Sequence, residues 1–442
     1  MLDIKFIREH AEAVKKASID KHIDIDIDEL LDIDRQRREL MSETESLQAT
    51  KNAVSKEIPS LSPDERKVKI LEMQEVDARQ AELEKKLKSI LERFNFLMAH
   101  VPNIPSPETP VGGDDSANVP WSYWSPIIGH VDPKDQAKVL EVPTKFTFPI
   151  KDHITLGRDL AILDLEAGVK TAGFRGYYLK NQGALLHYAL LWYAVKKLVA
   201  KGFDIFTPPT LVREFTLFGS GHFPGSKDEI YQIANTGGEP LYLAGTSEPA
   251  LLAYFSDTVL DEKELPKKVA GVSQCYRSEV GSYGKDTKGI YRIHEFSKVE
   301  QVVICKAEML EGEKWLEALR ETAEELLQEL KLPYRVLNIC TGDMGAGKYK
   351  MYDIETWMPS RESFGETHSD SNLTDWQARR LNIRYKATDG TIKYAYTLNN
   401  TAVASPRILI AILENYQQAD GSVVIPEVLR PFVGVDVIKQ LV

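Results

Sequence analysis

The sequence predicts an α+β protein that begins with an antiparallel coiled-coil arm, and three observations support this fold class. Two long polar segments in the first 100 residues carry apolar residues at every seventh position, a spacing typical of coiled coils. The segment Gln274–Cys305 begins and ends like β-strands around a polar loop with three glycines. Further along the chain, strand-like and helix-like segments adjoin near residues 177–209 and 396–418. A helical arm is therefore followed by a larger body of mixed structure.

Length and composition favour an intracellular protein of two or three domains. The chain has 442 residues, of which 43% are hydrophobic and 27% charged, an ordinary composition for a soluble protein. It contains no run of about 20 apolar residues, so we expect no membrane span. The first residues, MLDIKFIREH, lack the apolar core of a signal peptide. Cys275, Cys305 and Cys340 follow neither zinc-site nor disulfide spacing. We therefore expect a cytoplasmic location.

Residues 1–100 are predicted to form the arm. A short amphipathic helix from Asp3 to Ser18 is followed by a loop of alternating Ile and Asp. Two long helices then flank a turn at 59–63, where Pro63 suits the first position of a helix. Their apolar rows are Ile33, Leu40, Leu47 and Val54 in the first helix and Val76, Leu83, Ile90 and Leu97 in the second. Two such helices joined by a short turn form a coiled-coil hairpin.

Charge along the arm leaves its role open at this point. The formal net charge of the chain is −11, so any contact with RNA must use local basic patches. Basic residues are spread along the hairpin, namely Arg35, Arg37, Arg38, Lys51, Lys56, Arg66, Lys67, Lys69, Lys85, Lys86 and Lys88. On charge alone, a solvated coiled coil used for dimerisation or spacing explains them better. Residues 101–149, rich in Pro, Gly, Asp and Ser, are predicted to form a linker and the start of a body at 150–442.

The segment Gln274–Cys305 has the residue types of a nucleotide site. Arg277 and Glu279 would share one face of the first strand, because side chains two apart point the same way. The return strand would present Arg292, His294 and Phe296, then Lys298 and Glu300, on one face. Arginine forks bind phosphate oxygens, and an aromatic ring can stack on a base. The alternative is a surface hairpin with cross-strand ion pairs.

The same segment resembles a known motif. Arg-x-Glu, a long loop and Arg-x-His-x-Phe-x-Lys-x-Glu resemble motif 2 of the class II aminoacyl-tRNA synthetases, and YRSEVGSYGKDTKGIYRIHEF resembles the seryl-tRNA synthetase version. KGFDIFTPP resembles motif 1, which usually packs at a dimer interface, and TLNNTAVASPRILIAILENYQ resembles motif 3. The resemblance covers essentially the whole chain. It implies an antiparallel β-sheet core flanked by helices, a tRNA-binding arm and a homodimer.

The resemblance also implies site residues, carried over position by position. The catalytic residues would be Arg277, Glu300 and Arg407. The serine-binding residues would be Thr246, Ser247, Glu248, Arg277, Glu300 and Thr401. The ATP-binding residues would be Arg277, Ser278, Glu279, Arg292, Ile293, Phe296, Glu366, Thr367, His368, Ser369 and Arg407. Glu366 and Ser369 would also bind Mg²⁺, which prefers such oxygen ligands. Thr246 and Glu248 could instead serve only as helix-capping and first-turn residues.

Two stretches depart from simple motif matching. Gly342-x4-Gly347-Lys348 satisfies most of the P-loop pattern, but Tyr349 follows where a P-loop needs Ser or Thr, and the next residues suggest a strand. We therefore reject a P-loop. Asp370 stands where many bacterial members of the family have cysteine, and Asn400 and Ser405-Pro406 replace the common Gly and Val-Gly. Asp370 and Asn400 leave open an atypical serine pocket.

The resemblance implies ATP-dependent activation of L-serine to seryl-adenylate and transfer of the seryl group to tRNA(Ser), and by extension to tRNA(Sec). The tRNA would contact the arm and the motif 2 loop. Two alternatives remain. A ligase that loads an amino acid onto a carrier protein would lack or remodel the arm, which is full-length here. A non-enzymatic paralogue would have lost Arg277, Glu300, Glu366 or Arg407, and all four are present.

Overall fold

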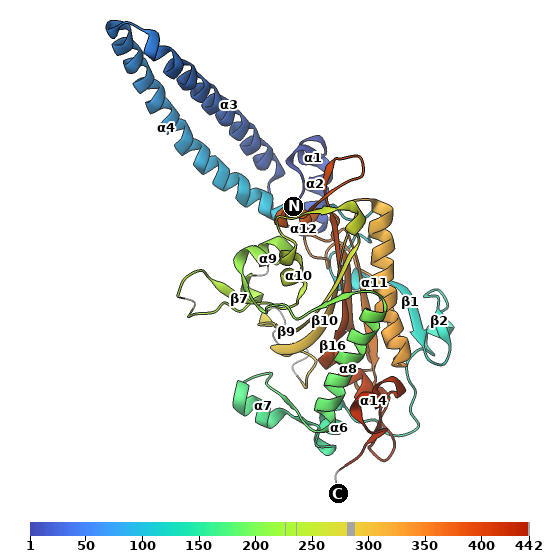
Figure 1. Ribbon diagram of the computed structural model, residues 1–442. Helices are drawn as coiled ribbons and strands as arrows, with labels where there is room; N and C mark the ends of the chain where they lie inside the picture. Colours follow the sequence, from blue (N-terminus) through green and yellow to red (C-terminus); the bar gives the residue numbers. More distant parts are fainter. Residues whose placement is uncertain (226, 236, 281–287, 441–442) are drawn as a thin grey trace. The chain divides into compact units, whose positions relative to one another are not determined.

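The computed structural model describes residues 1–225, 227–235, 237–280 and 288–440. Within these ranges the chain forms two compact units, Met1–Pro102 and Asn103–Val442 (Figure 1). The boundary lies close to the predicted end of the arm. Most of the predicted motif 2 loop, including Lys285 and Asp286, lies outside the described residues. In the described part of the chain, no helix is long and apolar enough to cross a membrane.

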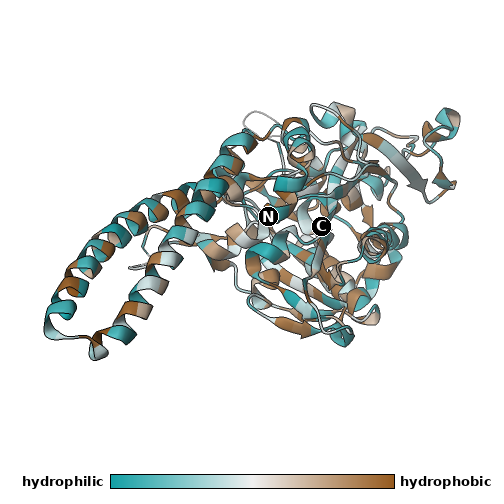
Figure 2. Ribbon diagram, turned by 90° about the horizontal axis from the view of Figure 1, so that it is seen from above, coloured by the Kyte–Doolittle hydropathy of each residue, from teal (hydrophilic) through white to brown (hydrophobic). Residues whose placement is uncertain are grey.

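The first unit confirms the predicted helix pair. Its long helices are α3 (Ile27–Glu57) and α4 (Pro63–His100), and they pack against each other. Ser62 caps α4 with a capping box that includes Glu65. Figure 2 shows hydrophilic residues recurring along both helices, as expected for a hairpin that buries only a narrow seam. The prediction of one helix over 3–18 is wrong, because non-helical backbone at His10 separates α1 (Ile4–Glu9) from α2 (Ala11–Asp20).

Ion pairs link the helices of this first unit. Arg93 Nη2 lies 2.5 Å from Glu29 Oε2, so the pair bridges α4 and α3 near one end of the hairpin. Nearer its turn, Lys51 Nζ lies 2.6 Å from Asp77 Oδ1. The carboxylate of Asp34 is fully buried and faces three arginines. Their distances to Asp34 oxygens are 3.8 Å for Arg8, 2.7 Å for Arg37 and 3.1 Å for Arg38.

The second unit is built on a nine-stranded sheet with the order β2-β1-β11-β12-β13-β16-β10-β9-β5. Neighbouring strands are antiparallel except for β5 and β9, which are parallel. The strands are β1 Val119–Ser125, β2 Gly129–Val131, β5 Asp204–Phe206, β9 Lys267–Tyr276, β10 Glu295–Cys305, β11 Tyr334–Asn338, β12 Lys350–Met358, β13 Ser363–Asn372 and β16 Tyr396–Ala404. The segment expected to be a linker thus supplies β1 and β2, which the sequence did not predict.

Three helices cover one face of this sheet, called the back face here. They are α8 (Gln182–Ala200), α11 (Met309–Glu329) and α13 (Ser405–Asn415), and their apolar residues share one core with β10 and β16 (Figure 1). Shorter helices α9 (Glu214–Ser220), α10 (Glu248–Tyr254) and α12 (Trp376–Leu381) pack together. Residues Val302 and Ile304, which point to the front face, contact a second core that includes α10 and α12. α13 ends at Asn415, earlier than the predicted end near Gln418.

The remaining elements are short and lie around the large sheet. The small sheets pair β3 with β4, β6 with β7, β17 with β18, and β14 with both β8 and β15. Their bounds are β3 Leu163–Asp164, β4 Tyr178–Leu179, β6 Leu211–Arg213, β7 Leu241–Leu243, β8 Val259–Asp261, β14 Arg384–Lys386, β15 Ile392–Tyr394, β17 Val423–Val424 and β18 Val437–Ile438. The short helices are α5 Gln136–Val139, α6 His153–Asp159, α7 Leu165–Ala172 and α14 Arg430–Val433.

Candidate active site

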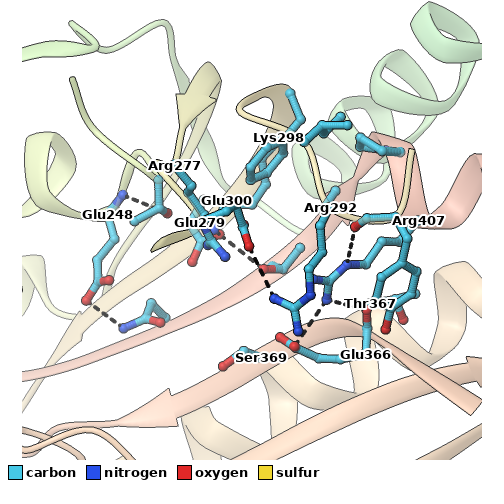
Figure 3. A pocket seen from close by; sticks show the side chains of 18 of the residues that line it. Glu248, Arg277, Glu279, Arg292, Lys298, Glu300, Glu366, Thr367, Ser369 and Arg407 are labelled. Carbon is cyan, nitrogen blue, oxygen red and sulfur yellow. Dashed lines mark hydrogen bonds and ion pairs between the residues drawn. The ribbon is translucent and has the colours of Figure 1, made fainter. Parts of the chain in front are cut away.

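A cavity on the front face of the sheet collects most of the predicted site residues. The predicted residues that line it are Thr246, Glu248, Arg277, Glu279, Arg292, Ile293, Phe296, Glu300, Glu366, Thr367, Ser369, Thr401 and Arg407. They come from the segment between β9 and β10, from β10, β13 and β16, from the start of α10 and the residues just before it, and from the start of α13. Figure 3 shows Glu248 at one end of this site and Arg407 with Glu366 at the other. The cavity therefore has an arginine-rich end and a carboxylate-rich end.

Arginines from three segments line the cavity, and two of them, Arg292 and Arg407, lie at the first end. Arg407, in the first turn of α13, donates from Nη1 to the carboxylate of Glu366 at 3.1 Å and to its carbonyl oxygen at 2.8 Å. Its guanidinium lies 4.5 Å from the centroid of the Tyr291 ring. Arg292 Nη1 donates to Glu279 Oε2 at 3.2 Å. The Arg277 guanidinium lies 5.4 Å from the centroid of the Phe296 ring. Forked cations held over aromatic rings suit a nucleoside triphosphate.

Strand β13 carries the oxygen ligands of this end. A β-bulge shifts its register against β12 between Ile354 and Glu355, so that Thr367 is the extra residue. Glu366, Thr367 and Ser369 consequently all line the cavity. Desolvation alone would raise the pKa of Glu366, but Arg407 and Arg277 outweigh it and hold that pKa below its ordinary value. An ionised carboxylate beside a hydroxyl can bind a cation at this end.

The other end is small and polar. Glu248, the first residue of α10, is 5% exposed, and its Oε1 accepts hydrogen bonds from Gln377 at 2.6 Å and Asn399 at 2.8 Å. A bulge between β10 and β16 sets Glu300 opposite Thr401, and the Thr401 hydroxyl donates to Glu300 at 3.4 Å. The pKa of Glu300 is raised above its ordinary value, because burial outweighs the lowering by neighbouring Lys298. Such a pocket suits a small substrate with an ammonium and a hydroxyl.

Three predicted site residues do not line the cavity. The Ser247 hydroxyl donates to the carbonyl of Gly271 at 3.4 Å, and the Ser278 hydroxyl donates to the carbonyl of Asp228 at 2.9 Å. His368 lies between the Thr367 hydroxyl at 2.9 Å and the carbonyl of Ala402 at 3.1 Å, and burial lowers its pKa to about 4. Each was included because its neighbours in the sequence belong to a motif. Their side chains instead support the backbone around the site.

The predicted strand ends around the motif 2 loop are wrong. β9 ends at Tyr276 and β10 begins at Glu295, so Arg277, Glu279 and Arg292 lie in irregular backbone. Glu279 has a positive φ of 55°, an uncommon conformation that ends strand alternation there. Arg277, Glu279 and Arg292 still reach the cavity. His294, expected on the same face, lines a neighbouring cavity instead, and its Nδ1 lies 2.9 Å from the carbonyl oxygen of Arg277.

Several residues that line the cavity were not assigned to it from the sequence. Lys298 could have been, because it stands two residues before Glu300 on the same strand, and Asn399 has the same spacing from Thr401. His222 and Lys348 lie in loops that only tertiary structure brings to the site. Lys348 belongs to the segment that resembles a P-loop, but β12 follows that segment, which confirms the rejection of a P-loop.

Asp370 and Asn400 lie outside the cavity. They are register partners on β13 and β16, and they continue a cross-strand row formed by Asn338, Tyr352, Asp370, Asn400 and Gln301. The row faces α11, because Asn400 donates to the carbonyl of Leu319 at 3.0 Å and Tyr352 donates to Glu317 at 3.1 Å. It therefore lies on the back face. These two departures from the family pattern do not alter the pocket surface directly, whereas Pro406, part of the third departure, lines the cavity.

Comparison with known proteins identifies relatives of the whole chain. Residues 1–105 match the family model "Seryl-tRNA synthetase N-terminal domain", and residues 231–416 match "tRNA synthetase class II core domain (G, H, P, S and T)". A serine–tRNA ligase of Deinococcus radiodurans is 43% identical over 435 residues, covering 98% of each chain. A serine–tRNA ligase of Symbiobacterium thermophilum is 39% identical over 434 residues, again covering 98% of each.

Solved structures agree with this result. The crystal structure of seryl-tRNA synthetase from Pyrococcus horikoshii complexed with ATP matches with a TM-score of 0.89 and 38% identity, covering 100% of both chains. That of the cytoplasmic serine–tRNA ligase from Naegleria fowleri in complex with AMP matches with a TM-score of 0.85 and 29% identity. This second match covers 100% of the present chain and 99% of the other. Both the arm and the body therefore have counterparts in single solved chains.

Proposed function

The chain belongs to the seryl-tRNA synthetase family of class II aminoacyl-tRNA synthetases, and from this premise we propose how its residues serve the serine–tRNA ligase reaction. One observation carries the proposal. A single cavity has Arg292 and Arg407 at one end and the Glu248, Glu300 and Thr401 group toward the other, with Arg277 beside Glu300. That arrangement fits ATP and L-serine bound side by side, with the serine carboxylate next to the α-phosphate.

In the first step, the serine carboxylate attacks the α-phosphorus of ATP, and the bond to the β-phosphate oxygen breaks to release pyrophosphate. Arg277 binds the serine carboxylate and the α-phosphate, so it neutralises charge on both reacting groups. Arg292 and Arg407 bind the β- and γ-phosphates. Glu279 and the backbone of Ile293 contact adenine, and Phe296 stacks on it. Catalysis is then mainly positioning and charge neutralisation.

Glu248, Glu300, Thr246 and Thr401 bind the ammonium and hydroxyl of serine. A site built to bond a hydroxyl rejects an analogue that lacks one, since its polar groups would be left unpaired. In the second step, a terminal ribose hydroxyl of the tRNA attacks the seryl carbonyl carbon and displaces AMP.

Glu366 and Ser369 would hold Mg²⁺. In the described residues, no group of three His, Cys, Asp or Glu side chains could hold a metal alone. A carboxylate and a hydroxyl fit a magnesium ion that takes its remaining ligands from phosphates and water. When bound, the ion would neutralise charge on the phosphates.

We also propose the partners that family membership implies. tRNA(Ser), and by extension tRNA(Sec), would bind through the arm and the motif 2 loop. A homodimer would form over α8, because Leu185, Tyr188, Trp192 and Val199 make a stripe on that helix whose side chains are 48–68% exposed. Such a stripe is typical of an interface. A cytoplasmic location fits the three buried cysteines, which form no disulfide among the described residues.

The test is ATP–pyrophosphate exchange with each of the twenty amino acids, followed by charging of tRNA(Ser) with and without its long variable arm and of tRNA(Sec). Exchange with serine alone and charging that requires the variable arm are the expected results. Serine exchange without any charging would favour a carrier-protein ligase. A folded protein without exchange would contradict the proposed chemistry altogether.

A further inference from the structure

Lys298 forms a close ion pair with Glu300 at the end of the cavity that is proposed to bind serine. The proposed function gives Lys298 no role. Its Nζ lies 2.5 Å from Oε2 of Glu300. Both residues are buried, at 5% and 2% exposure. They stand two positions apart on β10, so both side chains point to the front face and into the cavity. Figure 3 shows the two side chains beside Arg277.

The surroundings of Glu300 make this partner necessary. The charged and titratable groups around Glu300 come from several segments. They are Lys298 on β10 itself, Glu248 at the start of α10, Lys348 before β12, Cys275 on β9, Asp370 on β13 and Arg277 after β9. Burial and the Glu248 carboxylate raise the pKa of Glu300, whereas Lys298 is the first group that lowers it. The Thr401 hydroxyl at 3.4 Å is a long and uncharged contact. Without Lys298, Glu300 would more readily take up a proton.

A protonated Glu300 cannot serve the substrate well. Serine binds as an ammonium, which offers only donors, and a neutral carboxyl presents one acceptor fewer than a carboxylate. Loss of the lysine would also remove the contact that fixes the Glu300 side chain. Lys298 therefore controls both the charge and the orientation of the group that receives serine.

We propose that Lys298 is a positioning residue for serine, which holds Glu300 as an oriented carboxylate in the free enzyme. The proposal rests on the proposed function of the cavity and deepens it. Lys298 acts through Glu300, so its removal should weaken serine binding and change the pH dependence of serine activation. ATP binding should change much less.

The test compares Lys298→Met with Lys298→Arg in serine-dependent pyrophosphate exchange at saturating ATP, from acid to neutral pH. Methionine keeps most of the apolar stem and removes the charge. An opposite charge at this range shifts a carboxyl pKa by about one to three units. The acid limb of kcat/KM for serine should therefore move to higher pH in Lys298→Met, with a loss of at least about tenfold on that limb. Lys298→Arg should return the limb toward its original position.

Two further variants sharpen the result. Lys348→Met removes a second positive charge from the same cavity. It should shift the acid limb of kcat/KM for serine less than Lys298→Met does, because Lys348 influences Glu300 more weakly than Lys298 does. In a Glu300→Gln background, Lys298→Met should cause no further shift, because the group through which it acts is gone. Circular dichroism checks folding, and Lys298→Gln replaces Lys298→Met if the latter does not fold.

Other outcomes would overturn the proposal. An unmoved acid limb with a raised KM for ATP or a lower kcat would make Lys298 a nucleotide-contacting residue instead. A shift from Lys348→Met as large as that from Lys298→Met would show that overall cavity charge, not the contact with Glu300, sets the limb. Failure of the unaltered protein to activate serine would contradict the proposed function itself, and that measurement precedes the variants.

Discussion

Asn399 and Glu248 are joined by a hydrogen bond of 2.8 Å that ties strand β16 to the first residue of α10 at the floor of the cavity. Gln377 of α12 donates to the same carboxylate oxygen at 2.6 Å. Two separate segments therefore fix the side chain that is proposed to receive serine. Gln377 was expected from the sequence to support the fold of the site, whereas Asn399 was not assigned to it.

Asn399→Ala is expected to raise the KM for serine about tenfold, since a hydrogen bond to a charged group contributes about 1.5 kcal/mol. KM for ATP should change little. Asn400→Ala is the matched control, because Asn400 is the next residue on the same strand but faces α11. It should lower thermal stability and leave KM for serine unchanged. If Asn400→Ala raised the KM for serine and Asn399→Ala did not, the assignment of Asn399 to the cavity and of Asn400 to the back face would be wrong. Pyrophosphate exchange measures both variants.

Arg407→Lys should reduce kcat for pyrophosphate exchange by at least about 100-fold. Lysine cannot reproduce the forked donors that bond Glu366 or the planar contact with the Tyr291 ring. Arg361→Lys is the control, because the Arg361 guanidinium lies 4.2 Å from the same ring centroid without lining the cavity. Near-normal exchange by Arg407→Lys would show that a point charge is sufficient there.

Glu366→Gln should shift the magnesium requirement of exchange to higher concentration and lower activity at limiting Mg²⁺. The amide keeps the shape of the side chain but loses the charge that attracts the cation. It also weakens the contact with Arg407, so KM for ATP should rise. Titration of exchange with MgCl₂, after removal of divalent ions by EDTA, measures the shift. An unchanged magnesium dependence would remove Glu366 from the proposed metal site.

Trp192→Glu should weaken the proposed homodimer, because it places a charge in the centre of the exposed stripe on α8. Light scattering coupled to size exclusion should show monomer at concentrations where the unaltered protein is a dimer. Ile127→Glu is the control, since Ile127 is 83% exposed and lies outside that stripe. If both variants remain dimeric, the interface lies elsewhere.

Asp34→Ala should destabilise the arm by about 2 kcal/mol, because it removes the hydrogen bonds that the Asp34 carboxylate accepts from Arg37 and Arg38. Hydrogen exchange in the full-length protein should speed up in α3 and α4. Charging of tRNA should fall while serine-dependent pyrophosphate exchange persists. Asp64→Ala is the control, since the Asp64 side chain is 97% exposed. A loss of serine-dependent pyrophosphate exchange in Asp34→Ala would show that the arm affects the active site.

Patterns that repeat or extend over many residues were the most predictable from sequence. The seven-residue rows identified α3 and α4, and the motif around 274–305 identified Arg277 and Arg292 of the cavity. Position within a motif was a less reliable guide to which side chains face the cavity. Bulges such as that at Thr367 and irregular backbone such as Arg277–Glu279 break the alternation of side chains along a strand. Ser247, Ser278 and His368 were assigned by adjacency, but each satisfies a backbone group instead.

Contacts that depend on tertiary structure could not be predicted. Lys348 and Lys298 stand 50 positions apart in the sequence and line the same cavity. No local periodicity connects them, because long-range packing alone brings the two segments together. The strands β1 and β2 were missed for a related reason. Their prolines and polar residues suggest a loop, yet pairing with β11 makes β1 part of the sheet.

The pairing of Asp370 with Asn400 couples two substitutions. Asp370 and Asn400 are two of the positions at which this chain departs from the bacterial pattern, and they are neighbours across β13 and β16. Both side chains are fully buried against α11. A cysteine–glycine pair and an aspartate–asparagine pair differ in volume and polarity, so exchanging one member alone would leave a void or an overpacked polar group. Asp370→Cys and Asn400→Gly are therefore expected to be more destabilising singly than together.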